Sequence, residues 1–536
     1  MKKIAIIGAG PTGVYTFFSL LKEEQPLEIV VFERGNRAGI GMPYTHSDNS
    51  PMMLANIASI EVPPLFDTWL EWLQTQEAQY LAQFAVKKET LHQRQFLPRI
   101  LLGDYFRAQF LQAVHHAENR GFKVRLYESC EVTDVSAVST GVQLWTDQHT
   151  EPLHVDLAVI ATGHVWPDDD ESTHAFYPSP WSGLMDADVP AARVGILGTS
   201  LSALDAAMAV AVQHGTFHET EEHQVNFTLN KGSEALEITL MSRSGILPEA
   251  DFYCPIPYEP LEYVTDEAIQ REIAAGSTEL LDRVFRLMQQ ELALADPKWA
   301  RQMSLSSLDA DSFPVAVFAD RARSDPFEWA AANLKEVDEN KRNKHTVAWR
   351  YTLLRLHEKV QEIVTHLNEQ DSERFNVGLA RVFIDNYAAI PSESVRRMLA
   401  LRAAGILRIL TLGQDYRKEI KADRTEITTH NDRLSFDVFI DARGQKPLKT
   451  KDLPFPRLRQ QLLSCGDAIP DVGDDYTLQA PENVRGRIAF GALPYLMHDR
   501  PFIQGLVACQ EIGNAMARAV SKPASRLRRR LSIYDR

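Results

Sequence analysis

Three glycines near the start of the chain, Gly8, Gly10 and Gly13, have the spacing of a turn that binds a dinucleotide. They follow an apolar, strand-like run. Gly8 would allow the tight turn and Gly10 the close approach of a pyrophosphate, while Gly13 would let the next helix pack on the strand. We expect that helix to begin near Pro11 and to direct its first amides, with Thr12, toward the phosphates. An ordinary glycine-rich βα turn is the alternative interpretation.

An acidic residue stands where the ribose of such a nucleotide would lie. Glu33 follows Gly13 by about 20 residues and ends a second apolar run, residues 27–32. A carboxylate at this place accepts hydrogen bonds from ribose hydroxyls and disfavours a 2′-phosphate. We therefore expect FAD at this unit, with Glu33 and the neighbouring Arg34 among its contacts.

A second glycine turn ends the apolar run at residues 155–161. Thr162 and Gly163 follow that run, and small residues suit a place where the backbone passes close to a bound cofactor. The pattern is typical of the strand by which flavoproteins with two dinucleotides leave the FAD domain. Residues 435–444 repeat it with Arg443 in place of the threonine, so we interpret them as the return crossing.

A second nucleotide-like unit begins at residue 193. Gly198 provides the turn glycine, but Ser200 stands where a second glycine is usual, and its side chain would either donate a hydrogen bond to a phosphate or crowd it out. Arg243 ends a later strand-like run and is a candidate partner for a ribose 2′-phosphate. The unit predicts NADPH or NADH binding. A degenerate nucleotide fold kept as scaffold, with Arg243 as a surface residue, is the alternative.

The order of these patterns predicts an α/β protein with two Rossmann-like dinucleotide-binding units and a helical insertion. The insertion is expected at about 266–375, where charged, Leu- and Ala-rich segments have helical periodicity. The return crossing implies that the C-terminal part rejoins the first unit, where Gly491 is a further candidate flavin contact. The expected divisions are 1–165 for the first part of the FAD domain, 166–445 for the NAD(P)-like domain, 446–520 for the second part of the FAD domain, and 521–536 for a basic tail.

Composition limits the other classes of function. The chain has 536 residues, 44% of them hydrophobic, and a formal net charge of −15, so we expect no nucleic-acid or membrane partner. It begins directly with a strand-like run and has no apolar stretch of membrane-spanning length, so we expect a cytoplasmic protein. Four cysteines form no Cys-x-x-Cys pair and stand near no histidine in ligand spacing, which argues against a dithiol reductase and a metal site.

Longer motifs give the chain a family resemblance. They include residues 39–44, 53–58, 96–106, 161–167, 179–181, 242–252 and 382–391. With the glycine turn, they make the chain resemble, nearly end to end, the FAD-NAD(P)-binding proteins of the YdhS type, a resemblance that implies a flavoprotein oxidoreductase.

The resemblance implies roles for residues that spacing alone does not assign. Four residues would lie near the flavin ring: Gly41, Tyr44, Asn56 and Ile57. There an aromatic ring can pack on the isoalloxazine, and an amide can donate and accept hydrogen bonds at its polar edge. Ordinary packing is the alternative for Tyr44 and Asn56. Arg99 would bind a phosphate or carboxylate, or form a structural ion pair.

The leading functional hypothesis is an FAD-dependent oxidoreductase reduced by NADPH or NADH, with a monooxygenase related to the N-hydroxylating class as its finer form. The substrate is an unidentified small molecule. The alternative is a non-enzymatic or weakly catalytic flavin-binding protein whose helical insertion recognises a partner. No catalytic residue is assigned, and His164 and Asp251 are open candidates that follow two of the motifs. The cations of the basic tail could meet RNA or an anionic surface, but we favour a solvated tail.

Overall fold

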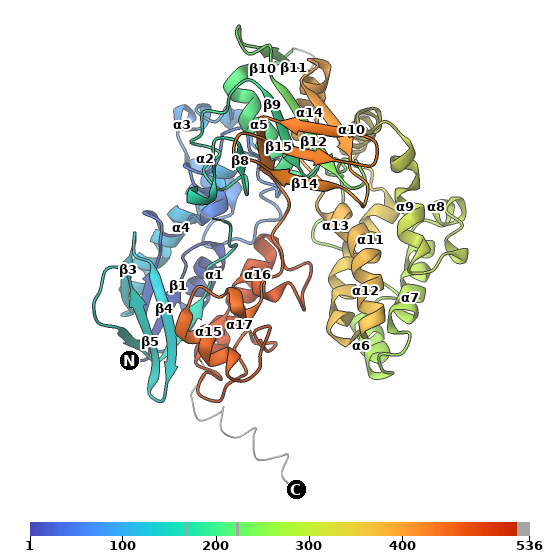
Figure 1. Ribbon diagram of the computed structural model, residues 1–536. Coiled ribbons are helices and arrows are strands. Elements are labelled where there is room, and N and C mark those ends of the chain that lie inside the picture. Colours follow the sequence, from blue (N-terminus) through green and yellow to red (C-terminus); the bar gives the residue numbers. More distant parts are fainter. Residues whose placement is uncertain (168, 221–223, 522–536) are drawn as a thin grey trace.

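The computed structural model describes residues 1–167, 169–220 and 224–521, and the expected basic tail from 522 onward lies outside them (Figure 1). A five-stranded parallel sheet forms the first unit, in the order β18-β7-β1-β2-β3. Its central strands are apolar and buried on both faces, as expected for a parallel sheet covered by helices. The strands are β1 (Lys3–Ile7), β2 (Glu28–Phe32), β3 (Lys123–Tyr127), β7 (Leu157–Ile160) and β18 (Ile488–Phe490).

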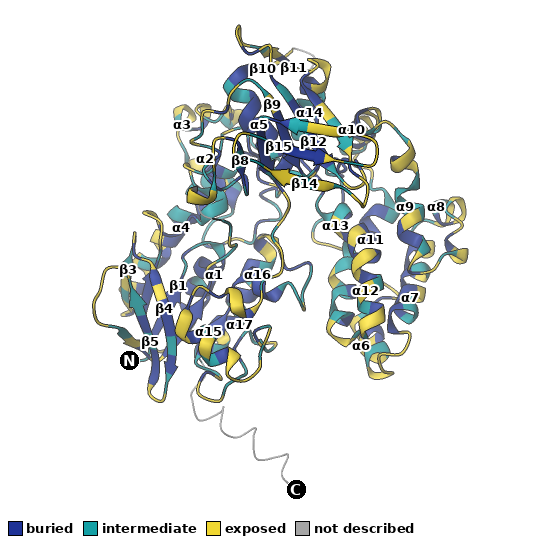
Figure 2. Cartoon of the chain, in the orientation of Figure 1, coloured by how far each residue is buried: buried dark blue, intermediate teal, exposed yellow. Residues whose placement is uncertain are grey.

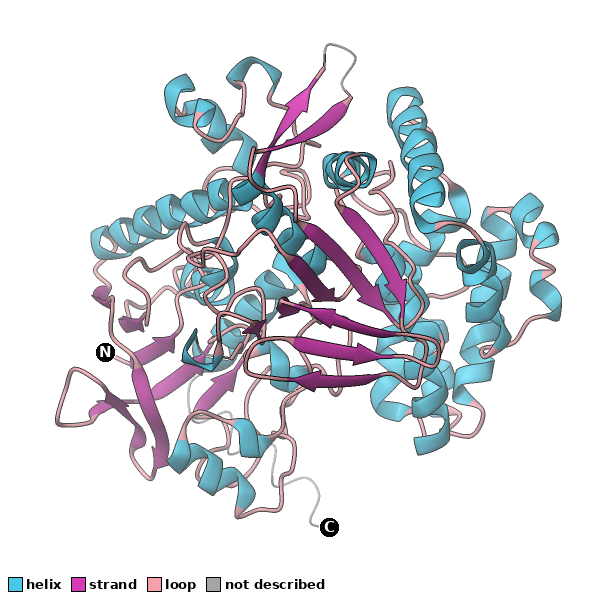
Figure 3. Cartoon of the chain, turned by 45° about the horizontal axis from the view of Figure 1, so that its top comes forward, coloured by secondary structure: helices cyan, strands magenta, loops and turns pink. Residues whose placement is uncertain are grey.

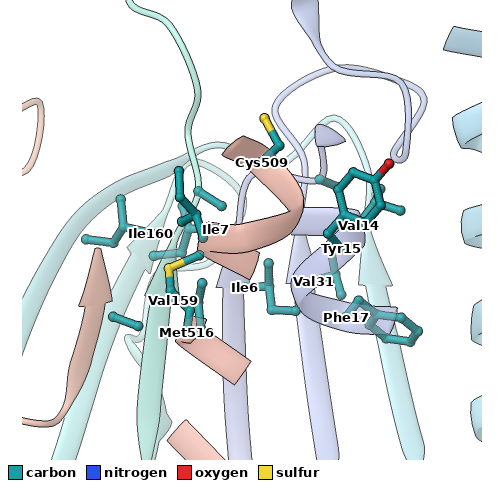
Figure 4. Close-up of a cluster of buried hydrophobic side chains, with 14 of the residues drawn as sticks. Ile6, Ile7, Val14, Tyr15, Phe17, Val31, Val159, Ile160, Cys509 and Met516 are labelled. Carbon is teal, nitrogen blue, oxygen red and sulfur yellow. The ribbon is translucent and has the colours of Figure 1, made fainter. Parts of the chain in front are cut away.

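Two helices from opposite ends of the chain pack together on this sheet. Helix α1 (Pro11–Leu20) and helix α17 (Gly505–Ser521) meet at Gly513, where a Cβ would lie only 2.8 Å from the Thr16 amide nitrogen. Figure 4 shows Met516 of α17 beside Val159 of the sheet, and both belong to the same buried cluster. The C-terminal part therefore completes the core that the first residues begin.

Further elements enclose the first unit. Helix α4 (Arg99–Asn119) packs against α1, and a three-stranded antiparallel sheet of β4 (Val132–Val138), β5 (Gly141–Thr146) and β6 (Leu153–Val155) lies beside the main sheet. The shorter helices of this unit are α2 (Trp69–Thr75), α3 (Ala78–Ala82), α15 (Pro456–Leu463) and α16 (Leu493–Leu496).

The second unit is another five-stranded parallel sheet, in the order β13-β12-β9-β17-β8. Helices lie against it in Figure 3, and an antiparallel sheet of β14, β15 and β16 stands beside it. The polar stretch before β12 contains a hairpin, β10 with β11, that the sequence did not predict. The elements are β8 (Phe176–Tyr177), β9 (Arg193–Leu197), α5 (Leu201–His214), β10 (Gly215–Glu219), β11 (Val225–Leu229), β12 (Glu237–Ser242), α14 (Ser392–Ala403), β13 (Leu407–Thr411), β14 (Arg417–Ile420), β15 (Thr425–Thr428), β16 (Arg433–Phe436) and β17 (Val438–Asp441).

A helical region lies between β12 and α14 and has a hydrophobic core of its own (Figure 2). Its helices continue beyond residue 375, the expected end of the insertion, because α13 adds another amphipathic segment that packs against α11 and α12. The helices are α6 (Asp266–Ala274), α7 (Leu280–Ala295), α8 (Pro297–Gln302), α9 (Ser312–Arg323), α10 (Pro326–Asn343), α11 (Ala348–Val360), α12 (Glu369–Val377) and α13 (Leu379–Tyr387).

One aromatic side chain from the C-terminal part enters this helical core. Phe502 is 6% exposed, and its ring lies 5.7 Å from that of Phe383 and 5.9 Å from those of Tyr387 and His357. The contact joins the first unit to the helical region. Among the residues that the structure describes, no helix is both long and apolar enough to span a membrane.

Candidate functional site

The residues predicted to hold FAD gather at one edge of the first sheet. Gly8 follows β1, Glu33 follows β2, Thr162 and Gly163 follow β7, and Gly491 follows β18. Because these strands are parallel, their carboxyl ends share one edge, which is where open α/β sheets bind ligands. The backbone hydrogen bond from the Gly491 amide to the Ile160 carbonyl, 2.8 Å, fixes the last of these turns against β7.

The three glycines of the first turn meet different neighbours. Gly8 has φ +94°, and a Cβ on it would lie 2.4 Å from the Ala161 carbonyl oxygen, so this turn and the crossing after β7 touch. A Cβ on Gly13 would lie 2.1 Å from the Gly8 carbonyl oxygen. Helix α1 can therefore pack against the glycine turn that precedes it because Gly13 has no side chain. Among the residues that the structure describes, a Cβ on Gly10 would meet Gly41 alone, with its Cα at 3.3 Å. Gly10 thus has one close backbone neighbour, which agrees with a surface kept bare for a ligand.

The first turn and Gly41 form a cradle without side chains. Gly41 has φ +81°, and a Cβ on it would lie 2.8 Å from Cδ of Pro11 and 3.1 Å from Cα of Gly10. Helix α1 begins at Pro11, with Thr12 buried in its first turn. Backbone amides at a helix N-terminus beside two bare glycines suit a pyrophosphate.

Glu33 is held beside the glycine turn. Its Oε2 accepts a hydrogen bond from the Ala9 amide at 3.0 Å, and its Oε1 accepts one from the Gly35 amide at 2.8 Å. The half-buried carboxylate therefore stands at the end of β2 with a fixed orientation, and the neighbouring Arg34 is exposed. This is the position from which a carboxylate can accept hydrogen bonds from the ribose hydroxyls.

The crossing after β7 offers polar atoms that lack partners. Gly163 has φ +69°, and no atom of the described residues lies within 4 Å of the place where its Cβ would be. Within the described residues, His164 Nδ1 and Trp166 Nε1 are buried and have no hydrogen-bond partner. Burial lowers the pKa of His164, so its imidazole is neutral and can bind a ligand through Nδ1. The open space and the unsatisfied atoms fit a bound cofactor.

The residues that the resemblance places near the flavin ring lie in two loops. Tyr44 packs on helix α4, with its ring 6.3 Å from that of Phe106, which favours the packing alternative for this residue. Asn56 is exposed and Ile57 half-buried in a loop held by the hydrogen bond from the Ala55 amide to the Leu97 carbonyl, 2.8 Å. Asn56 is therefore available to a ligand.

Arg99 joins the two nucleotide units. Its Nη2 donates to the Leu54 carbonyl at 3.1 Å and to Asp205 Oδ2 at 2.5 Å. Asp205 lies in α5, the helix of the second unit, and burial raises the pKa of its carboxyl while Arg99 lowers it. The structure thus favours the ion-pair alternative for Arg99. The sequence could not identify Asp205, because its partner lies in the other unit.

The second unit repeats the edge arrangement of the first. Gly198 and Ser200 follow β9, and Arg243 follows β12, the neighbouring parallel strand. Ser200 precedes α5, but its hydroxyl does not cap that helix. Arg243 is exposed. The two side chains are therefore accessible at the edge where a nucleotide would bind, while Arg443, after β17, pairs with Asp441 at 2.6 Å.

A polar cluster lies between the first unit and the loop after β12. Asp251 forms an ion pair with Lys341 at 3.1 Å, and Arg94 donates to the Cys254 carbonyl at 3.1 Å. Burial raises the pKa of Asp251, and it raises that of Glu61 to about 7 and that of the Cys254 thiol to about 12. The thiol is therefore protonated at neutral pH, and the carboxyl of Glu61 titrates near neutral pH.

The comparisons with known proteins agree with these two units. A family model described as FAD-NAD(P)-binding matches residues 5–165, and one described as YdhS-like middle domain matches residues 265–387. The uncharacterized protein YdhS of Escherichia coli strain K12 is 65% identical over 533 residues, which cover 99% of this chain and 100% of that protein. The chain belongs to the YdhS family. The predicted family, the α/β fold and the cofactors FAD and NAD(P) are confirmed, and the helical region is the YdhS-like middle domain of this family member.

Solved structures similar to this YdhS family member include two ornithine hydroxylases. The Kutzneria sp. 744 ornithine N-hydroxylase KtzI is 14% identical, with a TM-score of 0.47 and 99% of each chain covered. The reduced form of the ornithine hydroxylase PvdA from Pseudomonas aeruginosa is 13% identical, with a TM-score of 0.49, and the match covers 97% of this chain and 100% of that one.

Proposed function

We propose that the chain is an FAD-dependent oxidoreductase in which NADPH or NADH bound at the second unit reduces FAD bound at the first. The main support for the proposal is Arg99, whose guanidinium links the two nucleotide units. One guanidinium holds the Leu54 carbonyl, in the loop expected beside the flavin, and the Asp205 carboxylate, in the first turns of the helix expected beside the coenzyme. The bridge supports an arrangement in which the two nucleotides approach each other.

Bound FAD would supply hydride acceptance from the nicotinamide, and the residues would supply position and exclusion of water. Gly8, Gly10 and Gly41 would hold the pyrophosphate of FAD, and Glu33 its ribose. Gly198, Ser200 and Arg243 would hold the coenzyme. The proposed domain division puts residues 1–165 and 446–520 on the FAD and residues 166–445 on the coenzyme.

We further propose oxygen as the electron acceptor, as in a flavin-dependent monooxygenase. The cysteines support this choice over thiol-disulfide exchange. All four are unpaired, and burial raises the pKa of Cys130, Cys254 and Cys509, while only Cys465 is exposed. A reductase that relays electrons through a dithiol needs two cysteines close together and a stabilised thiolate.

The experiment is to follow coenzyme oxidation in air while measuring hydrogen peroxide and FAD content. We expect oxidation to require bound FAD and to yield peroxide in the absence of the substrate. The Gly10→Ala variant, which we expect to lack FAD, is the control. Coenzyme oxidation by that variant without flavin, or no oxidation by the FAD-loaded wild type, would contradict the proposal.

A further inference from the structure

A cavity of about 220 Å³ lies between the second nucleotide unit and the middle domain. On one side it is lined by Ser200, from the turn after β9, and by Ser244, from the loop after β12. On the other side it is lined by Phe318 of α9 and by Arg381 and Asp385 of α13. Elements far apart in the sequence therefore enclose one space at the edge of the second sheet.

Arg381 is the cationic side chain that lines this cavity, and it pairs with no carboxylate of the described residues. The side chain is exposed, its guanidinium carbon lies 5.7 Å from the centre of the Phe318 ring, and it forms no ion pair with any residue that the structure describes. Asp385, one turn further along α13, is already engaged, because Arg321 Nη2 donates to its Oδ1 at 3.0 Å. Arg321 also lies 3.8 Å from the buried Glu249. The negative charge near the cavity is thus compensated, and the positive charge of Arg381 is not.

The opposite wall carries hydroxyl groups, and Arg243 is the chain neighbour of one of the residues that line it. Thr199 uses its hydroxyl within the protein, donating to the Ile246 carbonyl at 2.8 Å. The Ser200 hydroxyl does not cap α5, and Ser244 is exposed next to Arg243, which is also exposed. Hydroxyl donors and an arginine that line one small cavity are groups that bind a phosphate monoester.

The position in the sheet indicates which phosphate would bind. In a Rossmann-like unit the end of the second strand lies beside the adenosine ribose, and an arginine nearby accommodates a 2′-phosphate. Here β12 is the strand next to β9, and Ser244 follows it by two residues. We propose that the cavity binds the ribose 2′-phosphate of NADPH and that Arg381 of the middle domain is its principal cation.

This inference rests on coenzyme binding at the second unit, as in the proposed function, and it extends that proposal to a role for the middle domain. Helix α13 would complete the coenzyme site, so that the domain that distinguishes this family would select NADPH over NADH. Arg243 would contribute from the nucleotide unit itself.

The test measures binding of two probes to the FAD-loaded full-length protein by calorimetry. The probes are 2′,5′-ADP, which carries the 2′-phosphate, and 5′-AMP, which lacks it. Loss of a charged contact to a phosphate predicts that Arg381→Gln lowers the ratio of 2′,5′-ADP affinity to 5′-AMP affinity about tenfold or more. Arg381→Lys should recover part of the ratio, because it keeps the charge and loses the fork.

Arg301→Gln is the matched control, since Arg301 is an exposed arginine of the same domain, on α8, and does not line the cavity. It should leave the ratio unchanged. Ser244→Asp is an independent test, because a carboxylate across the cavity should repel the 2′-phosphate and lower the ratio as well. An unchanged ratio in Arg381→Gln, or wild-type protein that binds both probes equally, would overturn the inference.

The two proposals fail in different ways. If 2′,5′-ADP binds through Arg381 while neither coenzyme reduces the flavin, the oxidoreductase proposal is wrong and the phosphate site stands. If both coenzymes reduce the flavin and Arg381→Gln keeps the wild-type ratio of probe affinities, the phosphate site is wrong and the oxidoreductase proposal stands.

Discussion

Replacing Gly10 by alanine should remove FAD from the protein and leave its fold intact. Among the described residues the new Cβ would meet the Gly41 Cα alone, at 3.3 Å, and the backbone at Gly10, with φ −74° and ψ −174°, is one that alanine adopts without strain. We expect a stability cost below about 1 kcal/mol, which corresponds to a melting temperature within about 2–4 °C of wild type. The methyl group would nevertheless occupy the approach to the pyrophosphate.

Gly13→Ala is the matched variant, two residues into α1. Its Cβ would lie 2.1 Å from the Gly8 carbonyl oxygen, a backbone atom, so α1 must move away from β1. Overpacking of this kind costs about 1–3 kcal/mol. The assay is thermal melting of both variants stripped of FAD, together with flavin absorbance of the proteins as purified. Wild-type flavin content in Gly10→Ala would refute the pyrophosphate assignment, and a wild-type melting temperature in Gly13→Ala would refute the packing argument.

Three further perturbations follow from the structure. Glu61→Gln tests a pH dependence: burial raises the pKa of Glu61 from 4.5 to about 7 in the folded protein, so the native state binds the extra proton between these values and wild-type stability falls as pH rises through that window. The variant should lack this slope, on the order of 1 kcal/mol per pH unit, in denaturation series from pH 4.5 to 7.5, and parallel curves would contradict the assignment. Arg243→Ala should weaken NADPH about tenfold and NADH much less in coenzyme titrations, and equal losses would remove its role at the 2′-phosphate. Phe502→Ala should lower the free energy of unfolding by about 3–5 kcal/mol, because it removes a buried aromatic side chain. It should also loosen the C-terminal part from the middle domain, which limited proteolysis would detect as faster cleavage. An unchanged rate of cleavage would contradict this role of Phe502.

The sequence predicted the parts of the fold that depend on neighbouring residues. An apolar run, a glycine turn and a helix are local signals, and the runs before Gly8 and Gly198 form β1 and β9 as predicted. The hairpin of β10 and β11 was not predicted, because its strands are short and polar. Their composition gives no strand signal, and they form strands by pairing with each other. The helices continue past residue 375, the expected end of the insertion, because α13 adds a further amphipathic helix.

Contacts between elements far apart in the chain could not be predicted from the sequence. Arg99 has the residue type of a phosphate ligand, and only the fold shows that Asp205, across the junction, takes its guanidinium. Arg381 carries no motif at all. It becomes a candidate because α13 places it opposite Ser200 and Ser244 around one cavity. Such juxtapositions depend on how the units pack together, which periodicity does not encode.

The most direct test of the central claim, that the two nucleotide units serve one redox reaction, is the visible spectrum of the FAD-loaded protein after anaerobic addition of NADPH or NADH. We predict that the oxidised flavin band bleaches, and that NADPH bleaches it at lower concentration than NADH. A flavin band that neither coenzyme bleaches would contradict the claim and would favour a flavin-binding protein without this reductase activity.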